Sequence, residues 1–299
     1  MRILVAGANG LVGSRLVHAL HGTQAVVALT RGRLVAHLAG VGHVVADLAD
    51  PEAVERAVAE ARPEVIVNCA AMTDVDGCER APTQAFAANV TGVAALARSA
   101  RACGAHLLHV STDYVFDGEA GPYLPQAVPN PRGVYALTKH MGEQAVRALA
   151  EPGRWAIART AVVYGWPAAG QRNFGSWLVE SLSRGQGLKL FEDQWVSPSL
   201  ALNVAELLAE LALRRLPGLW HACGAEVVNR VEFALRLCDA FGFDPALVQP
   251  SRMADVPLLS PRPARAGLDV AATASALTAQ PLGLLASLER FRDAVGGTP

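Results

Sequence analysis

The stretch "RILVAGANGLVG" (residues 2–13) decides the fold of this chain. Its first five residues predict a strand, and the GxxGxxG pattern that follows predicts a loop opening into a helix. Gly7 permits a tight turn, Gly10 lets the backbone approach a pyrophosphate, and Gly13 permits close helix–strand packing. The amides at the N-terminus of that helix would then face the phosphates. The stretch predicts a dinucleotide-binding unit, and its alternative is a tight turn that binds nothing.

Strands and helices alternate through the first half of the chain. Apolar, β-branched runs predict strands at 2–6, 25–29, 43–47, 64–68, 106–110 and 155–159, and helical patterns lie at 11–20, 51–61, 82–102 and 134–149. This alternation predicts an α/β fold, a Rossmann-type doubly wound parallel sheet with a small C-terminal substrate-binding lobe. After residue 165 the rhythm breaks into a loop (165–173), a strand (188–190) and helices at 174–184, 203–214 and 230–241. We expect a dinucleotide-binding domain over 1–165, with 200–222 returning to it, and a lobe formed by 166–199 and 223–299.

The composition argues against several classes of protein. A net charge of -1 over 299 residues gives no electrostatic reason to expect nucleic acid or an anionic membrane as partner. No apolar run approaches the ~18 residues of a membrane span, and the N-terminus lacks a signal peptide's long apolar core. The five cysteines form no CxxC pair, which indicates a reducing cytoplasm and argues against a disulfide framework or a zinc site. We therefore expect a cytoplasmic globular protein that holds no metal.

Two arginines follow the second predicted strand. The segment "LTRGR" (29–33) places Arg31 and Arg33 where NAD-preferring sites usually carry an acidic residue. Because arginine matches a phosphate with two parallel hydrogen bonds, the pair favours NADPH over NADH. The alternative is a pair of solvated loop arginines. Asp47, at the end of the third strand, would either accept from the adenine amino group or cap the helix beginning at Pro51.

Polar residues end the fifth predicted strand, in "STDYVFDG" (111–118). Ligands of parallel sheets bind outside the carboxyl ends of the strands, so these side chains should face the glycine loop. Tyr135 and Lys139 follow, one helical turn apart. An ammonium favours the phenolate and lowers the pKa of a tyrosine from about 10, which suits proton transfer to a carbonyl. Only Lys139 and Lys189 are lysines in an arginine-rich chain, so a compact ammonium is indicated, the alternative being an exposed Tyr–Lys pair.

Together, "GANGLVG", "STDYVFDG" and "YALTKHMGE" resemble the extended short-chain dehydrogenase/reductases, and within them the dTDP-4-dehydrorhamnose reductase-like family. The resemblance continues through 68–92, 159–165, 193–199 and 262–269 and covers nearly the whole chain. It implies reduction of the 4-keto group of a nucleotide-linked 6-deoxysugar by NADPH, with NADH as the other candidate donor. Tyr135 would protonate the developing alkoxide, Lys139 would bind the nicotinamide ribose and tune Tyr135, and Thr112 would orient the reacting oxygen.

The resemblance also implies which residues surround the two ligands. At the cofactor it implies Gly7, Asn9, Gly10, Leu11, Val12, Gly13, Arg31, Asp47, Leu48, Cys69, Ala70, Ala71, Asn89, Tyr135 and Lys139. At the sugar nucleotide it implies Thr73, Val75, Asp113, Tyr114, Val162, Asn173 and Trp195. Asn68 would lie along the cofactor, and Asp76 and Glu79 would either line the sugar pocket or cap a helix.

The chain departs from the family pattern around the sugar. Val162 stands where the family has a tryptophan that packs on the sugar, Pro125 replaces an acid, and Ala136 replaces a glycine after Tyr135. Because a tryptophan is a large flat contact, its loss leaves the identity of the sugar open.

Two other functions compete with the reductase. One is a silent NADP-binding partner protein similar to the regulatory β subunit of methionine adenosyltransferase. The other is a nucleotide-sugar epimerase or dehydratase, although dehydratases commonly carry Asp-Glu where this chain has Asp113 and Tyr114. Some relatives form homodimers, and the sequence leaves that possibility open.

Overall fold

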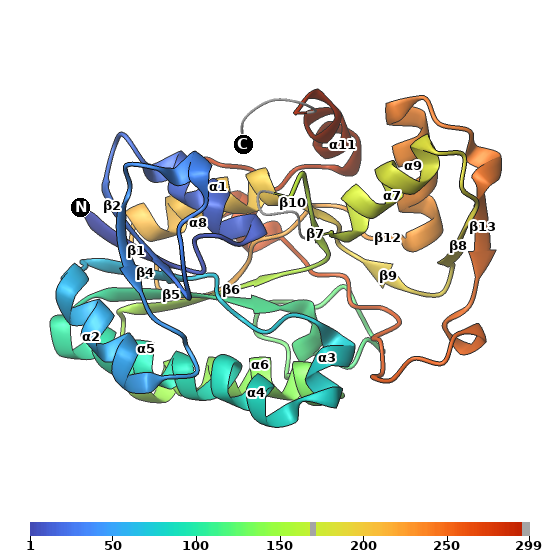
Figure 1. Ribbon diagram of the computed structural model, residues 1–299. Coiled ribbons are helices and arrows are strands. Elements are labelled where there is room, and N and C mark those ends of the chain that lie inside the picture. Colours follow the sequence, from blue (N-terminus) through green and yellow to red (C-terminus); the bar gives the residue numbers. More distant parts are fainter. Residues whose placement is uncertain (168–171, 295–299) are drawn as a thin grey trace.

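The computed structural model describes residues 1–167 and 172–294. Within these residues seven strands form one sheet, in the order β11-β6-β5-β4-β1-β2-β3 (Figure 1). Every pairing in this sheet is parallel, which confirms the predicted doubly wound α/β fold. The strands are β1 (Arg2–Ala6), β2 (Ala25–Thr30), β3 (Gly42–Val45), β4 (Val65–Asn68), β5 (His106–Thr112), β6 (Trp155–Thr160) and β11 (Gly218–His221).

Helices cover both faces of this sheet, which explains why its strands are apolar on both sides (Figure 1). On one face α1 (Leu11–Leu20) and α8 (Ala201–Leu213) pack together, with Leu16, Val204 and Leu208 fully buried. On the other face lie α2 (Pro51–Ala61), α5 (Gly92–Cys103) and α6 (Val134–Leu149). No helix of the described residues is long and apolar enough to cross a membrane.

The predicted helices at 11–20, 51–61 and 134–149 are confirmed with the same boundaries. The single helix predicted over 82–102 is wrong in detail, because it is split into α4 (Pro82–Phe86), a π-helical turn (Ala87–Thr91) and α5. Asn89 lies within that turn, and its side chain bonds Met72 and Thr138. Such a turn inserts an extra residue into a helix and is common near functional sites. Local helix propensity could not predict this turn, because the hydrogen-bond partners of Asn89 lie elsewhere in the chain.

The later part of the chain builds a second cluster beside the sheet. Its elements are β7 (Val163–Tyr164), α7 (Phe174–Ser183), β8 (Leu188–Phe191), β9 (Trp195–Val196), β10 (Ser199–Leu200), β12 (Val228–Asn229), α9 (Arg230–Phe241), β13 (Val248–Ser251) and α11 (Leu284–Asp293). An aromatic core that includes Tyr164, Phe233 and Phe291 joins most of them. Residues 200–222 instead supply α8, which packs on α1, and β11, which pairs with β6. Helix α10 (Ala271–Ala276) likewise packs on β11 of the main sheet.

The division of the chain into two folding units stays a prediction. Of the predicted loop 165–173, residues 168–171 lie outside the described residues.

Candidate active site

A cavity of about 1680 Å³ lies at the carboxyl ends of the parallel strands and extends to the smaller lobe. It brings together almost all of the residues that the sequence places at the two ligands. Those lining it are Gly7, Asn9, Gly10, Leu11, Val12, Gly13, Arg31, Asp47, Leu48, Cys69, Ala70, Ala71, Thr73, Val75, Thr112, Asp113, Tyr114, Tyr135, Lys139, Val162 and Asn173.

Three residues predicted at the ligands, Asn68, Asn89 and Trp195, do not line this cavity. Asn89 is fully buried beneath it, where it accepts from the Met72 amide at 2.8 Å. Trp195 is 37% exposed and lines a separate, smaller hollow with Val227 and Arg265. Asn68 also lies below the cavity, where its Oδ1 accepts from the Ala70 amide at 3.0 Å. Asn68 and Asn89 therefore hold the loop after β4 from underneath.

The glycine loop is shaped for a phosphate group. Gly7 has φ +76°, and a Cβ there would lie 2.7 Å from the Ala70 nitrogen. A Cβ on Gly13 would lie 2.2 Å from the Gly7 oxygen, so helix α1 approaches the loop more closely than any side chain permits. Gly10 precedes α1 and provides no side-chain cap, which leaves the first-turn amides of α1 to a ligand. The residues present fit a dinucleotide pyrophosphate.

At the adenosine end of the cavity, Arg31 and Arg33 are exposed on the loop after β2. The Asn9 side chain holds that loop by donating to the Arg33 oxygen at 2.8 Å. Asp47 accepts from the Ala49 amide at 2.9 Å, while Asp50 caps α2. The capping role considered for Asp47 is therefore wrong, and Asp47 lines the cavity.

Thr112, Tyr135 and Lys139 are each nine-tenths buried or more. The Lys139 Nζ donates to the Val110 oxygen at 2.8 Å, which holds the ammonium beneath the end of β5. Burial lowers the pKa of Lys139 to about 8. Burial also raises the pKa of Tyr135 above its ordinary value, and the neighbouring Thr112 hydroxyl offsets only part of this. In the protein chain alone, burial is the largest influence on the pKa of Tyr135, and Lys139 is not among the groups that act on it. The lowering expected from Lys139 therefore stays a prediction for the cofactor-bound protein.

Asp113 is a buried carboxyl group at the floor of the cavity. Its Oδ1 accepts from the Thr112 hydroxyl at 3.0 Å, and its Oδ2 has no hydrogen-bond partner in the part of the chain that the structure describes. Burial raises the pKa of Asp113 to about 7. The ring of Tyr114 packs edge-on against that of Tyr135, with centroids 5.6 Å apart. The polar strand end thus surrounds the phenol of Tyr135.

The smaller lobe adds residues that the sequence analysis missed. Arg230 stacks on Phe174 at 4.5 Å and donates to Gln194 at 2.9 Å. Its pKa is lowered by burial, while the charges of Tyr114 and Asp113 act in the opposite direction. A signal was present, because an arginine at the first position of a helix opposes the helix dipole. Trp177 packs against the core of this lobe and also lines the cavity, one turn after Asn173.

Asp76 and Glu79 do not line the cavity. Both contact Ser260, which belongs to a segment, residues 255–262, that does line it. Among residues 1–167 and 172–294, no three His, Cys, Asp or Glu side chains gather as a metal site requires.

Comparisons with known proteins show the family to which the chain belongs. A family model, the RmlD substrate binding domain, matches residues 1–295. The chain is 38% identical over 269 residues to dTDP-4-dehydrorhamnose reductase of Mycobacterium tuberculosis, covering 87% of this chain and 82% of the relative. A dTDP-4-dehydrorhamnose reductase of Streptomyces griseus is 38% identical over 257 residues, covering 84% and 79%.

Two solved structures have the same fold. A dTDP-4-dehydrorhamnose reductase from Clostridium acetobutylicum matches with a TM-score of 0.84 and 27% identity, over 99% of this chain and 100% of that one. A hypothetical dTDP-4-dehydrorhamnose reductase from Sulfolobus tokodaii matches with a TM-score of 0.85 and 30% identity, over 96% and 99%. The predicted resemblance is confirmed, and the chain belongs to the RmlD substrate binding domain family.

Proposed function

We propose that this protein reduces the 4-keto group of a dTDP-linked 6-deoxysugar, with NADPH as the hydride donor. The observation that carries the proposal is the meeting of Thr112, Tyr135 and Lys139 in one cavity with the glycine loop. The names of the relatives above, dTDP-4-dehydrorhamnose reductases, support the choice of substrate class.

When bound, NADPH supplies the hydride. The chain itself supplies the proton and the alignment of the carbonyl. Burial keeps the Tyr135 phenol protonated, which makes it the acid that donates to the developing alkoxide. The Thr112 hydroxyl lies beside this phenol and can orient the same oxygen. The Lys139 ammonium, fixed on the Val110 oxygen, stabilises the phenolate that remains.

The preference for NADPH rests on Arg31, which lines the adenosine end of the cavity and is free to meet a phosphate. We also place the protein in the cytoplasm, a proposal supported by five cysteines that are all free thiols.

The test is oxidation of NADPH by the purified protein, against a panel of dTDP- and GDP-linked 4-keto-6-deoxysugars generated in situ. We expect turnover with a dTDP-linked sugar, faster with NADPH than with NADH, and lost in Tyr135→Phe. Tight cofactor binding without reduction of any sugar would overturn the proposal and favour a regulatory partner protein.

A further inference from the structure

Helix α3 (Val75–Arg80) connects the helix that carries Tyr135 to the far wall of the cavity. The Glu79 Oε1 accepts from the Val134 amide at 2.8 Å and from the Ser260 hydroxyl at 2.8 Å. Val134 is the first residue of α6 and directly precedes Tyr135. One carboxylate oxygen therefore joins the N-terminus of the catalytic helix to a segment more than a hundred residues later in the chain.

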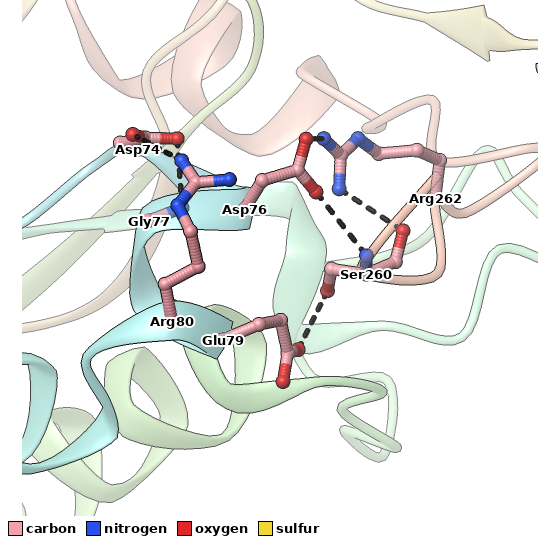
Figure 2. A network of polar contacts seen from close by, with 7 residues as sticks. All are labelled: Asp74, Asp76, Gly77, Glu79, Arg80, Ser260 and Arg262. Atoms are coloured by element: carbon pink, nitrogen blue, oxygen red, sulfur yellow. Dashed lines mark hydrogen bonds and ion pairs between the residues drawn. The ribbon is translucent and has the colours of Figure 1, made fainter. Parts of the chain in front are cut away.

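That segment, residues 255–262, is called the wall segment here because Asp255, Val256, Leu258 and Arg262 line the cavity. A second carboxylate of α3 holds it in place. Asp76 accepts from the Ser260 amide at 3.2 Å and from the Arg262 guanidinium at 2.9 Å (Figure 2). Arg262 in turn donates to the Ser260 oxygen at 3.1 Å. A ligand touching the wall segment thus touches a group that is bonded to α3.

Helix α3 is itself fixed at its start. Asp74 caps it by accepting from the Gly77 amide at 2.9 Å and pairs with Arg80 at 3.4 Å, as Figure 2 shows. Because a helix of six residues has little stability of its own, these contacts are what make it a rigid connection.

The backbone before α6 is shaped around this junction. Gly133 has φ +85°, and a Cβ there would lie 2.4 Å from the Ser260 Oγ and 2.7 Å from the Glu79 Oε1. A glycine is therefore required on two counts, conformation and space. Because Gly133 has no side chain, Glu79 and Ser260 can lie against the start of α6.

We propose that Glu79 is a positioning residue, which couples the wall segment to the place of the Tyr135 hydroxyl. Contact between a sugar nucleotide and the wall segment is transmitted through Ser260 and Glu79 to the first turn of α6. The inference rests on the proposed function for its substrate. Its physical basis is that a displacement of about 1 Å in a reacting group can cost about 10²-fold in rate.

Four variants separate this role from a structural one. Glu79→Ala removes both hydrogen bonds, Ser260→Ala removes only the bond to the wall segment, and Glu79→Gln retains an oxygen that can accept both. Glu226→Ala is the matched control, because Glu226 is half-buried and accepts from the first amide of α11, Leu284, at 2.8 Å, away from the cavity.

We expect Glu79→Ala to lower kcat by about 10- to 100-fold with the Kd for NADPH unchanged. Ser260→Ala should lower kcat less, Glu79→Gln should restore it, and Glu226→Ala should lower the Tm comparably while leaving kcat unchanged. If Glu79→Ala and Ser260→Ala keep kcat within about twofold of the wild type, or if Glu226→Ala loses as much as Glu79→Ala, the inference is overturned.

A second measurement needs no turnover. Amide hydrogen exchange at Val134 and Tyr135 is followed with and without dTDP as the probe. We expect dTDP to slow exchange in the wild type but not in Ser260→Ala. Absence of protection in the wild type, or equal protection in both, overturns the inference. Absence of sugar reduction together with this protection would overturn only the proposed function.

Discussion

Replacing Lys139 with methionine is expected to stabilise the folded protein at neutral pH while abolishing turnover. The Lys139 side chain is 3% exposed, and burial lowers its pKa from 10.5 to about 8, against the opposing effect of Glu143. Because one pKa unit corresponds to about 1.4 kcal/mol, burying this ammonium costs about 3 kcal/mol of folding free energy at pH 7. Methionine has similar length and carries no charge, although it leaves the Val110 oxygen without its donor.

The stability difference between the variant and the wild type is expected to change sign with pH. Between pH 8 and 10.5 the unfolded chain holds the Lys139 proton and the folded chain releases it, so the stability of the wild type rises with pH over that window. The lost bond to Val110 costs the variant about 1 kcal/mol at any pH. Lys139→Met should therefore be more stable than the wild type by about 2 kcal/mol at pH 7, and slightly less stable by pH 10.5.

Urea unfolding of both proteins at pH 7, 8.5 and 10 measures the difference in their free energies of unfolding. Buried cysteines and tyrosines titrate in both proteins, so their contributions cancel in this difference. The exposed Lys189, replaced by methionine in the same way, serves as the control and should give a difference that is flat with pH. A Lys139→Met variant that is destabilised by the same amount at every pH would refute the reasoning, because the ammonium would then carry no burial cost.

Four further variants have defined outcomes. Gly13→Ala places a Cβ 2.2 Å from the Gly7 oxygen and should abolish NADPH binding in isothermal titration; an unchanged Kd would contradict the glycine-loop site. Glu143→Gln leaves the fully buried Arg159 without its bidentate partner at 2.7 and 2.8 Å and should cost about 3–5 kcal/mol in urea unfolding. Replacing both Glu143 and Arg159 with methionine should recover most of that lost stability. A loss below about 1 kcal/mol for Glu143→Gln would refute the argument that the buried pair depends on both charges. Arg31→Ala should raise the KM for NADPH about tenfold and leave that for NADH nearly unchanged, since a charged hydrogen bond to a phosphate contributes about 1.5–3 kcal/mol; equal effects would exclude Arg31 from cofactor choice.

Local sequence patterns predicted much of the fold and of the candidate site. The glycine loop, the strand ends and the Tyr135–Lys139 spacing each depend on residues close together in the chain, so each could be read directly. The roles of Asn89 and Trp195 could not be read in this way. Asn89 has partners on the loop after β4 and on α6, and the orientation of Trp195 depends on pairing with Arg265, seventy positions later.

The sequence by itself determined the parallel sheet, the glycine loop and a lysine one helical turn from a tyrosine, because periodicity, turn chemistry and helical spacing are local properties. That this pair is buried was decided by the tertiary structure. Only the tertiary structure decided how the charges are balanced. It placed Arg230 in the same cavity as Asp113 and joined Glu79 to the wall segment. It also showed that burial raises the pKa of Tyr135, because the pKa of a group depends on the burial created when distant segments pack around it.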